Sequence, residues 1–208
     1  MNILEAYNLW SQIYDTNRNL TRDLDLIVSK TILSNFYFKN ILEIGCGTGK
    51  NTEWLIDIST HVLSIDFSEK MLEIARKKIK TEQVKFLQFD ICKNWNFSKD
   101  KFDLISFNLV LEHFENLEII FEKAKNKLTK NGLLFISELH PFRQYQGTKA
   151  RFEHENKTIE LEVYKHNLSD YWNVAKKLDF NCLQFNEWNS ESEENETPRL
   201  VTFIFQKH

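Results

Sequence analysis

The stretch ILEIGCGTGKNTEW, residues 41–54, joins a short apolar run to three alternating glycines and then to a predicted helix. Two kinds of nucleotide-binding loop look much like it. A dinucleotide-binding turn requires Gly-x-Gly-x-x-Gly, but the place of its third glycine is taken here by Lys50. A phosphate-binding Walker loop requires Gly-x-x-x-x-Gly-Lys-Ser/Thr, but its first and last places hold Ile44 and Asn51. Both alternatives therefore fail on particular residues.

The pattern that remains is an acidic residue followed by glycine at every second position: Glu43, Gly45, Gly47 and Gly49. Glycine has no Cβ, so such a loop can bend sharply and its backbone can come close to a ligand. Glu43 would present an anion to a cationic group of that ligand. Cys46 fills a small-residue place within the loop, and we expect no thiol chemistry from it.

Apolar segments typical of strands alternate with helical segments along the rest of the chain. This alternation predicts right-handed crossovers and a parallel sheet. The predicted fold class is an α/β three-layer sandwich with a mostly parallel seven-stranded sheet whose last strand is antiparallel. The expected strands are 41–44, 61–66, 84–90, 102–108, 132–139, 181–188 and 199–207, and the expected helices among them are 52–58, 68–80, 117–128 and 169–180.

Two segments extend this predicted single domain of residues 1–208. Residues 1–39 repeat apolar side chains at spacings of three and four, which predicts an N-terminal helical cap. Residues 140–168 interrupt the strand and helix pattern after the fifth strand, and we expect them to form a substrate lid. Within them Pro141 predicts a turn, and residues 152–164 are typical of a hairpin.

Composition narrows the possible functions. The chain has 208 residues, 42% of them hydrophobic, and a net charge of −3, so it lacks the basic surplus of an extended nucleic-acid surface. Its three cysteines are far apart and form no CxxC pair, which argues against a disulfide framework and a zinc site, and we expect no metal. We see no signal peptide and no apolar run of about 20 residues. The sequence thus predicts a cytoplasmic protein without a membrane partner, and it leaves the oligomeric state open.

The glycine loop and the strand ends together resemble the class I (Rossmann-like) S-adenosylmethionine-dependent methyltransferases of the small-molecule type. Asp66 ends the second predicted strand about 20 residues after Gly45, where an acid can accept hydrogen bonds from both ribose hydroxyls. FDLISFNLVLEHFEN (102–116) and KLTKNGLLFISE (127–138) resemble the fourth-strand and fifth-strand motifs of that family. The resemblance covers most of the chain and implies S-adenosyl-L-methionine as the cofactor.

The resemblance also implies roles for residues at the strand ends. It places Phe67 and Met71 beside the adenine, and Asp90 with Ile91 at the adenine amine. Asn108 and Leu109 correspond to the place where the methionine end of the cofactor meets the substrate.

In the N-terminal segment, Tyr14 and Arg22 flank the cofactor site in the related pattern. We expect the guanidinium of Arg22 to bind the cofactor carboxylate. The alternative is that Arg22 is a surface charge paired with Asp23 or Asp25.

The expected reaction is O- or N-methylation of a small molecule held between the loops after strands 4 and 5 and the 140–166 insert. The Asp/Asn-Pro-Pro-aromatic motif of base-amine methyltransferases is absent from the segment after the fourth strand. His140 and His166 are the candidate catalytic bases, and His113 and Tyr145 the candidate substrate-binding residues. A methyltransferase acting on a protein or tRNA, and a non-catalytic S-adenosylmethionine-binding partner subunit, are the alternatives.

Overall fold

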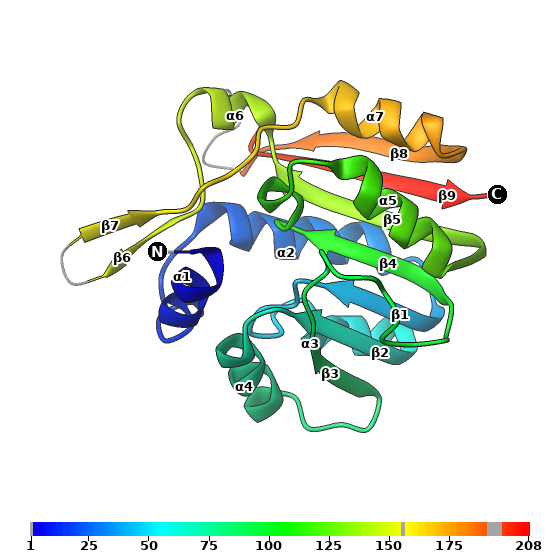
Figure 1. The fold of residues 1–208 in the computed structure, drawn as a ribbon, viewed down its shortest axis with the longest axis horizontal. Helices are drawn as coiled ribbons and strands as arrows, with labels where there is room; N and C mark the ends of the chain where they lie inside the picture. Colours follow the sequence, from blue (N-terminus) through cyan, green and yellow to red (C-terminus); the bar gives the residue numbers. More distant parts are fainter. Residues whose placement is uncertain (1, 155–156, 191–196) are drawn as a thin grey trace.

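A computed structural model describes residues 2–154, 157–190 and 197–208. The sheet strands are β1 (Phe38–Ile44), β2 (Ser59–Asp66), β3 (Val84–Gln88), β4 (Phe102–Asn108), β5 (Leu128–Leu139), β8 (Phe180–Trp188) and β9 (Leu200–Lys207). They form one seven-stranded sheet in the order β3-β2-β1-β4-β5-β9-β8 (Figure 1). The first five strands are parallel, and β9 runs antiparallel to β5 and β8 on either side of it. The predicted fold class is confirmed.

Helices connect the strands and begin at polar caps. They are α1 (Ile3–Trp10), α2 (Leu20–Leu33), α3 (Thr52–Leu55), α4 (Glu69–Lys78), α5 (Leu117–Lys127), α6 (Pro141–Tyr145) and α7 (Leu168–Lys177), with 3-10 turns η1 (Ile56–Ile58) and η2 (Leu111–His113). The side chains of Asn19, Ser68 and Asn116 accept a backbone N–H in the first turn of α2, α4 and α5. Such a cap satisfies a donor that the helix itself cannot pair.

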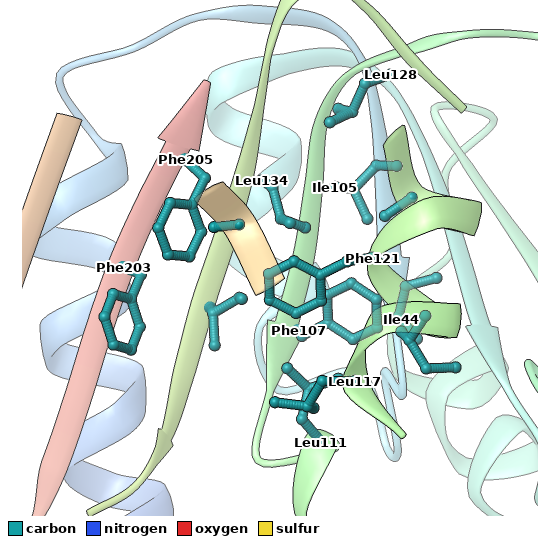
Figure 2. Close-up of a cluster of buried hydrophobic side chains, with 14 of the residues drawn as sticks. Ile44, Ile105, Phe107, Leu111, Leu117, Phe121, Leu128, Leu134, Phe203 and Phe205 are labelled. Carbon is teal, nitrogen blue, oxygen red and sulfur yellow. The ribbon is translucent and has the colours of Figure 1, made fainter. Parts of the chain in front are cut away.

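Strand residues divide between two cores because successive side chains point to opposite faces of a sheet. In β5, Leu133 and Phe135 join the core under α2 and α3, whereas Leu134 and Ile136 join the core under α5 and α7. Figure 2 shows this second core. The aromatic side chains labelled there come from β4, α5 and β9: Phe107, Phe121, Phe203 and Phe205.

The structure adjusts two local expectations. β1 begins at Phe38, so the last residues of the predicted helical cap belong to the sheet. Pro141, expected to force a turn, instead begins α6. A proline suits the first helical position, where its missing N–H would have no partner in any case.

The insert after β5 reaches back to the N-terminal helix. It carries a separate hairpin of β6 (Arg151–His154) and β7 (Lys157–Glu160), and residues 155–156 of the predicted turn lie outside the described residues. The hairpin lies beside α1 (Figure 1), where the rings of Trp10 and Phe152 stack with centroids 5.0 Å apart. Phe152 and Leu161 are buried in a third apolar cluster with Ala6 and Trp10 of α1. The insert therefore holds α1 in place.

Candidate functional site

A cavity of about 650 Å³ opens at the carboxyl ends of β1, β2 and β4. Ligands of open parallel sheets bind at such strand ends. The cavity is lined by Ile3, Leu4, Tyr7, Tyr14, Ile44, Gly45, Gly47, Ile65, Asp66, Phe67, Met71, Gln88, Phe89, Asp90, Ile91, Cys92, Lys93, Asn108, Leu109, Val110, His113 and Phe114. The sheet and its loops thus form the floor, and α1 supplies the cover.

The glycine loop forms one wall of this cavity. Gly45 and Gly47 line it and have positive φ angles of 70° and 53°, a conformation that favours glycine. A Cβ on Gly45 would overlap the side chain of Val110, in the turn after the neighbouring strand β4. Gly49 is required for packing instead, because a Cβ there would come within 2.9 Å of Ile79 at the end of α4. The first two glycines therefore shape the cavity, and the third permits helix packing.

Asp66 organises the loop and lines the cavity. Its carboxylate accepts the backbone N–H groups of Gly47 and Ser68, each at 2.8 Å. Burial raises the pKa of Asp66 to about 6, although bonds from backbone N–H groups oppose the increase. An acceptor for ligand hydroxyls is thereby fixed against the glycine loop.

The predicted adenine end lies around the ends of β2 and β3. Phe67, Met71, Asp90 and Ile91 all line the cavity, as do Gln88, Phe89, Cys92 and Lys93, which the sequence did not indicate. Met71 and Ile91 are buried. The strand-end positions chosen from the sequence are thus brought together around one apolar space.

Asn108 and Leu109 line the cavity where β4 ends. Leu109 has a positive φ of 57°, which is uncommon for a residue with a side chain, and its N–H donates to the carbonyl of Ser137 at 2.8 Å. The amide of Asn108 donates to Asp25 and Ser29 of α2. The turn after β4 is therefore held from β5 and from α2.

A hydrogen-bonded pair closes the opposite side. The hydroxyl of Tyr7 lies 2.8 Å from Nε2 of His113, and the two rings meet edge to face. Burial lowers the pKa of His113 to about 4, an effect that the nearby backbone of Glu162 only partly opposes. Burial also raises the pKa of Tyr7. Both side chains are therefore neutral near pH 7.

Residues 42–136 match the family model described as a methyltransferase domain. The matched residues include the glycine loop, Asp66, Asp90 and the turn after β4, so this part of the chain is similar to a methyltransferase domain. The chain is 29% identical to a ubiquinone biosynthesis O-methyltransferase of Pelagibacter ubique and 32% identical to a malonyl-[acyl-carrier protein] O-methyltransferase of Bacillus cytotoxicus. Each match covers 59% of this chain but only 50% and 44% of those two proteins. The chain thus spans about half the length of these curated relatives.

A solved structure supports the fold over the whole chain. The N-methyltransferase NodS from Bradyrhizobium japonicum, in complex with S-adenosyl-l-homocysteine, aligns with a TM-score of 0.73 at 15% identity and covers 100% of this chain and 99% of its own. At that identity the likeness concerns the fold. The alignment includes the segments that hold α1 and the insert.

Glu43 is placed differently from its predicted role. Only 3% of it is exposed, it does not line the cavity, and its Oε2 accepts the hydroxyls of Thr52 (2.5 Å) and Ser64 (2.7 Å). Burial raises the pKa of Glu43 to about 7, although these two hydrogen bonds oppose it. Cys46 is likewise buried outside the cavity lining, and burial raises the pKa of its thiol. In this structure Glu43 joins β1 to α3 and β2.

Tyr14 lines the cavity as predicted, but Arg22 supports it from behind. The Arg22 guanidinium lies 4.0 Å from the centre of the Tyr14 ring and donates to the Tyr14 carbonyl (2.5 Å). It also donates to the backbone and side-chain oxygens of Asn17, and none of these bonds involves Asp23 or Asp25. The predicted carboxylate contact of Arg22 stays a prediction, since here the guanidinium holds the α1–α2 loop.

His140 does not line the cavity. It is fully buried at the start of α6, where Nδ1 accepts the N–H of Phe142 at 3.2 Å. Its Nε2 lies 2.7 Å from Oε1 of Glu187 on β8. The imidazole therefore connects the insert to the edge strand of the sheet, and its predicted role as a base has no support from this placement.

His166 and Tyr145 also lie outside the cavity lining. Nε2 of His166 donates to the carbonyl of Phe114 at 2.7 Å, so this histidine holds a residue that does line the cavity. Tyr145 is 58% exposed, and its hydroxyl donates to Asn167. The insert thus supports the cavity from a second layer, and the part of it that the structure describes contributes no side chain to the lining.

Lys123 of α5 is a supporting residue that sequence reasoning missed. Its ammonium donates to the carbonyls of Ile91, Cys92 and Lys93 at 3.0, 2.8 and 3.1 Å. Three consecutive carbonyls of the loop after β3 are thereby fixed against one cation. A lysine in the middle of an amphipathic helix gives no signal of such a contact.

Within residues 2–154, 157–190 and 197–208, no group of three or more His, Cys, Asp or Glu side chains is arranged to hold a metal ion. Over the same ranges, no helix combines the length and the apolar character that a membrane span requires.

Proposed function

We propose that this chain binds S-adenosylmethionine in the 650 Å³ cavity and transfers its methyl group to an oxygen or nitrogen of a small molecule. The observation that carries the proposal is the two-sided lining of the cavity. One side has glycines without a Cβ and the Asp66 carboxylate, and the other side has the neutral Tyr7–His113 pair. A hydroxyl-rich ligand and a second reactant would therefore meet between them.

The lining fits the cofactor. In the proposed complex Asp66 accepts hydrogen bonds from the ribose hydroxyls. The adenine packs against Phe67, Met71 and Ile91, and Asp90 accepts a hydrogen bond from its amine. Gly45 lets the backbone approach the ligand where any side chain would collide with Val110. When bound, the cofactor supplies a methyl group on a positively charged sulfur, and positioning then accounts for most of the catalysis.

Tyr7 and His113 would orient the acceptor. In the tautomer that carries its proton on Nδ1, Nε2 of His113 accepts a hydrogen bond from the Tyr7 hydroxyl, and the Tyr7 oxygen keeps lone pairs for an acceptor O–H or N–H. The imidazole is neutral near pH 7, and a pKa of about 4 makes it a weak base, so the pair acts by orienting the nucleophile: the Tyr7 oxygen accepts a hydrogen bond from it beside the methyl group. This assignment replaces His140 and His166, whose rings lie outside the lining.

Coverage of the cavity favours a small acceptor over a macromolecule. Ile3, Leu4 and Tyr7 of α1 line the cavity, and the β6–β7 hairpin packs on α1. A protein or tRNA substrate would have to displace both layers. The names of the two curated relatives specify O-methylation, which supports oxygen as the acceptor atom.

The test has two stages. Calorimetry with S-adenosylhomocysteine and with NAD should show micromolar or tighter binding of the first alone; binding of NAD alone would refute the cofactor assignment. A turnover screen with phenols, carboxylic acids and amines should then give methylated product. Cofactor binding without turnover on any small molecule, but with methylation of protein or tRNA, would favour a macromolecular substrate. Cofactor binding without any transfer would favour a non-catalytic partner subunit.

A further inference from the structure

The amide of Asn108 is held in one orientation by α2. Its Nδ2 donates to Oδ1 of Asp25 and to Oγ of Ser29, each at 2.8 Å. An amide nitrogen has two N–H donors, so both are used. Asp25 and Ser29 are 4% and 1% exposed, which shields both bonds from water.

The network around Asp25 excludes the flipped amide. Ser29 donates its own hydroxyl to Oδ1 of Asp25 at 3.1 Å, and Asn51 donates to Oδ2 at 3.1 Å. A carboxylate offers acceptors only, so a flipped Asn108 would direct its oxygen at an acceptor. Burial raises the pKa of Asp25, and the hydrogen bonds from its neighbours oppose the increase.

The Asn108 oxygen is consequently the atom left for a ligand. Asn108 lines the cavity, and no residue that the structure describes donates a hydrogen bond to its Oδ1. A hydrogen-bond acceptor that is fixed beforehand in a cavity selects a ligand with a donor at that place.

The position of Asn108 identifies the donor. β4 pairs with β1 so that Phe107 faces Ile44, which places Asn108 beside Gly45 at the start of the glycine loop. The adenine and ribose residues lie instead at the ends of β2 and β3, on the other side of β1. The part of the cofactor nearest Asn108 is then its amino-acid end, whose only donor is the α-ammonium.

We propose that Asp25, with Ser29, is a positioning residue that fixes Asn108 as the acceptor for the α-ammonium of the cofactor. The inference rests on the proposed cofactor. The buried carboxylate acts through the amide: it never touches the ligand, yet it decides which end of the Asn108 amide the ligand meets.

Three ligands separate this role from a structural one. S-adenosylhomocysteine has both the ammonium and the carboxylate, decarboxylated S-adenosylmethionine keeps the ammonium alone, and 5′-methylthioadenosine has neither. In calorimetry, Asp25→Ala should weaken binding of the first two about tenfold or more, as expected for a charge-assisted hydrogen bond, and change 5′-methylthioadenosine less than about twofold. Equal losses for all three would overturn the inference.

A double-mutant cycle tests whether Asp25 acts through Asn108. Asn108→Ala should reproduce the selective loss, and adding Asp25→Ala to it should cause little further loss, whereas additive losses would show independent roles. Asp23→Ala is the matched control, because it removes one carboxylate from an exposed place on the same helix. Ser29→Ala should give a smaller loss with the same ligand pattern if Asp25→Ala does not fold. A loss confined to S-adenosylhomocysteine would assign Asn108 to the carboxylate and refute the proposal. If wild-type protein binds none of the three ligands, the proposed function itself fails.

Discussion

The Tyr7 hydroxyl and the His113 Nε2, 2.8 Å apart, join the first helix of the chain to the turn after the fourth strand. The contact crosses the cavity from its cover to its floor. Tyr7 also meets Phe67 edge to face at 5.7 Å and stacks on Trp10 at 5.7 Å. One tyrosine therefore contacts the proposed adenine side, the proposed acceptor side and the aromatic anchor of α1.

Removing that hydroxyl should impair transfer more than cofactor binding. For a hydroxyl acceptor, Tyr7→Phe should lower kcat by about 10²-fold, as for loss of a group that orients the nucleophile, while the Kd for S-adenosylhomocysteine changes less than about threefold. Steady-state kinetics with calorimetry measures both. Tyr145→Phe, at an exposed tyrosine of the insert, is the control and should leave kcat unchanged. Equal kcat in wild type and Tyr7→Phe would remove the pair from the mechanism.

Cofactor affinity should fall in acid because of Asp66. Its pKa in the folded protein is raised to about 6, and only the ionised carboxylate can accept from both ribose hydroxyls. Below pH 6 the proton competes with the ligand, so the Kd for S-adenosylhomocysteine at pH 5 should be about tenfold above its value at pH 7.5. Calorimetry across pH 5–8 measures the change. Asp66→Asn should bind weakly at every pH, and a profile for wild type that is equally flat would contradict the assignment.

Glu43 should make the fold less stable as pH rises. Its pKa is raised in the folded protein to about 7 from 4.5, so between these values the folded state binds more protons than the unfolded state, and stability is lost with increasing pH. Glu43→Gln has no such proton to lose and can keep both hydroxyl bonds. Urea unfolding should show it more stable than wild type at pH 8 by up to roughly 3 kcal/mol, with little difference at pH 4.5. Glu53→Gln, on the exposed side of α3, should not change the slope; a wild-type slope unaffected by Glu43→Gln would contradict the prediction.

The stacking of Phe152 on Trp10 should hold the cover closed. Phe152→Ala removes a side chain that is only 3% exposed from a small cluster separate from the two sheet cores. We expect faster dissociation of S-adenosylhomocysteine and easier proteolysis of α1, with a smaller loss of sheet stability than the 3–5 kcal/mol typical of a core Phe→Ala. Stopped-flow kinetics and limited proteolysis measure these changes. Tyr37→Ala, at a 70% exposed ring, is the control. An unchanged dissociation rate of S-adenosylhomocysteine would show that the β6–β7 hairpin does not control opening of the cavity.

The proposed cofactor side of the cavity could be predicted because its residues follow directly from strand ends. Asp66, Asp90 and Asn108 each end or follow a strand that the apolar pattern reveals, and parallel strands deliver their carboxyl ends to one edge. Their placement depends on local sequence and on one topological rule. Glu43 shows the limit of such reasoning: it lies inside a strand whose side chains alternate, and the buried hydroxyls of Thr52 and Ser64 decide which way it faces.

The proposed acceptor side could be predicted only in part, because it is assembled from distant segments: the sequence indicated His113 but not its partner Tyr7. Tyr7 meets His113 across more than a hundred residues, and in the sequence Tyr7 is one of several apolar positions on an amphipathic helix. His140 follows the correct strand, but Glu187 from β8 draws its ring toward the sheet edge. Residue spacing and composition indicate neither the Tyr7–His113 contact nor the His140–Glu187 contact.

The cover of the cavity also constrains how the protein can be handled in the laboratory. α1 begins at Ile3, and Ile3 and Leu4 already line the cavity, so a purification tag or fluorescent fusion joined ahead of this helix would lie at the cavity mouth. The other end of the chain lies across the molecule from α1 (Figure 1), after a strand that ends at Lys207. Tags attached after His208 would leave the cover untouched, and assays comparing the two placements would report on the freedom that α1 needs.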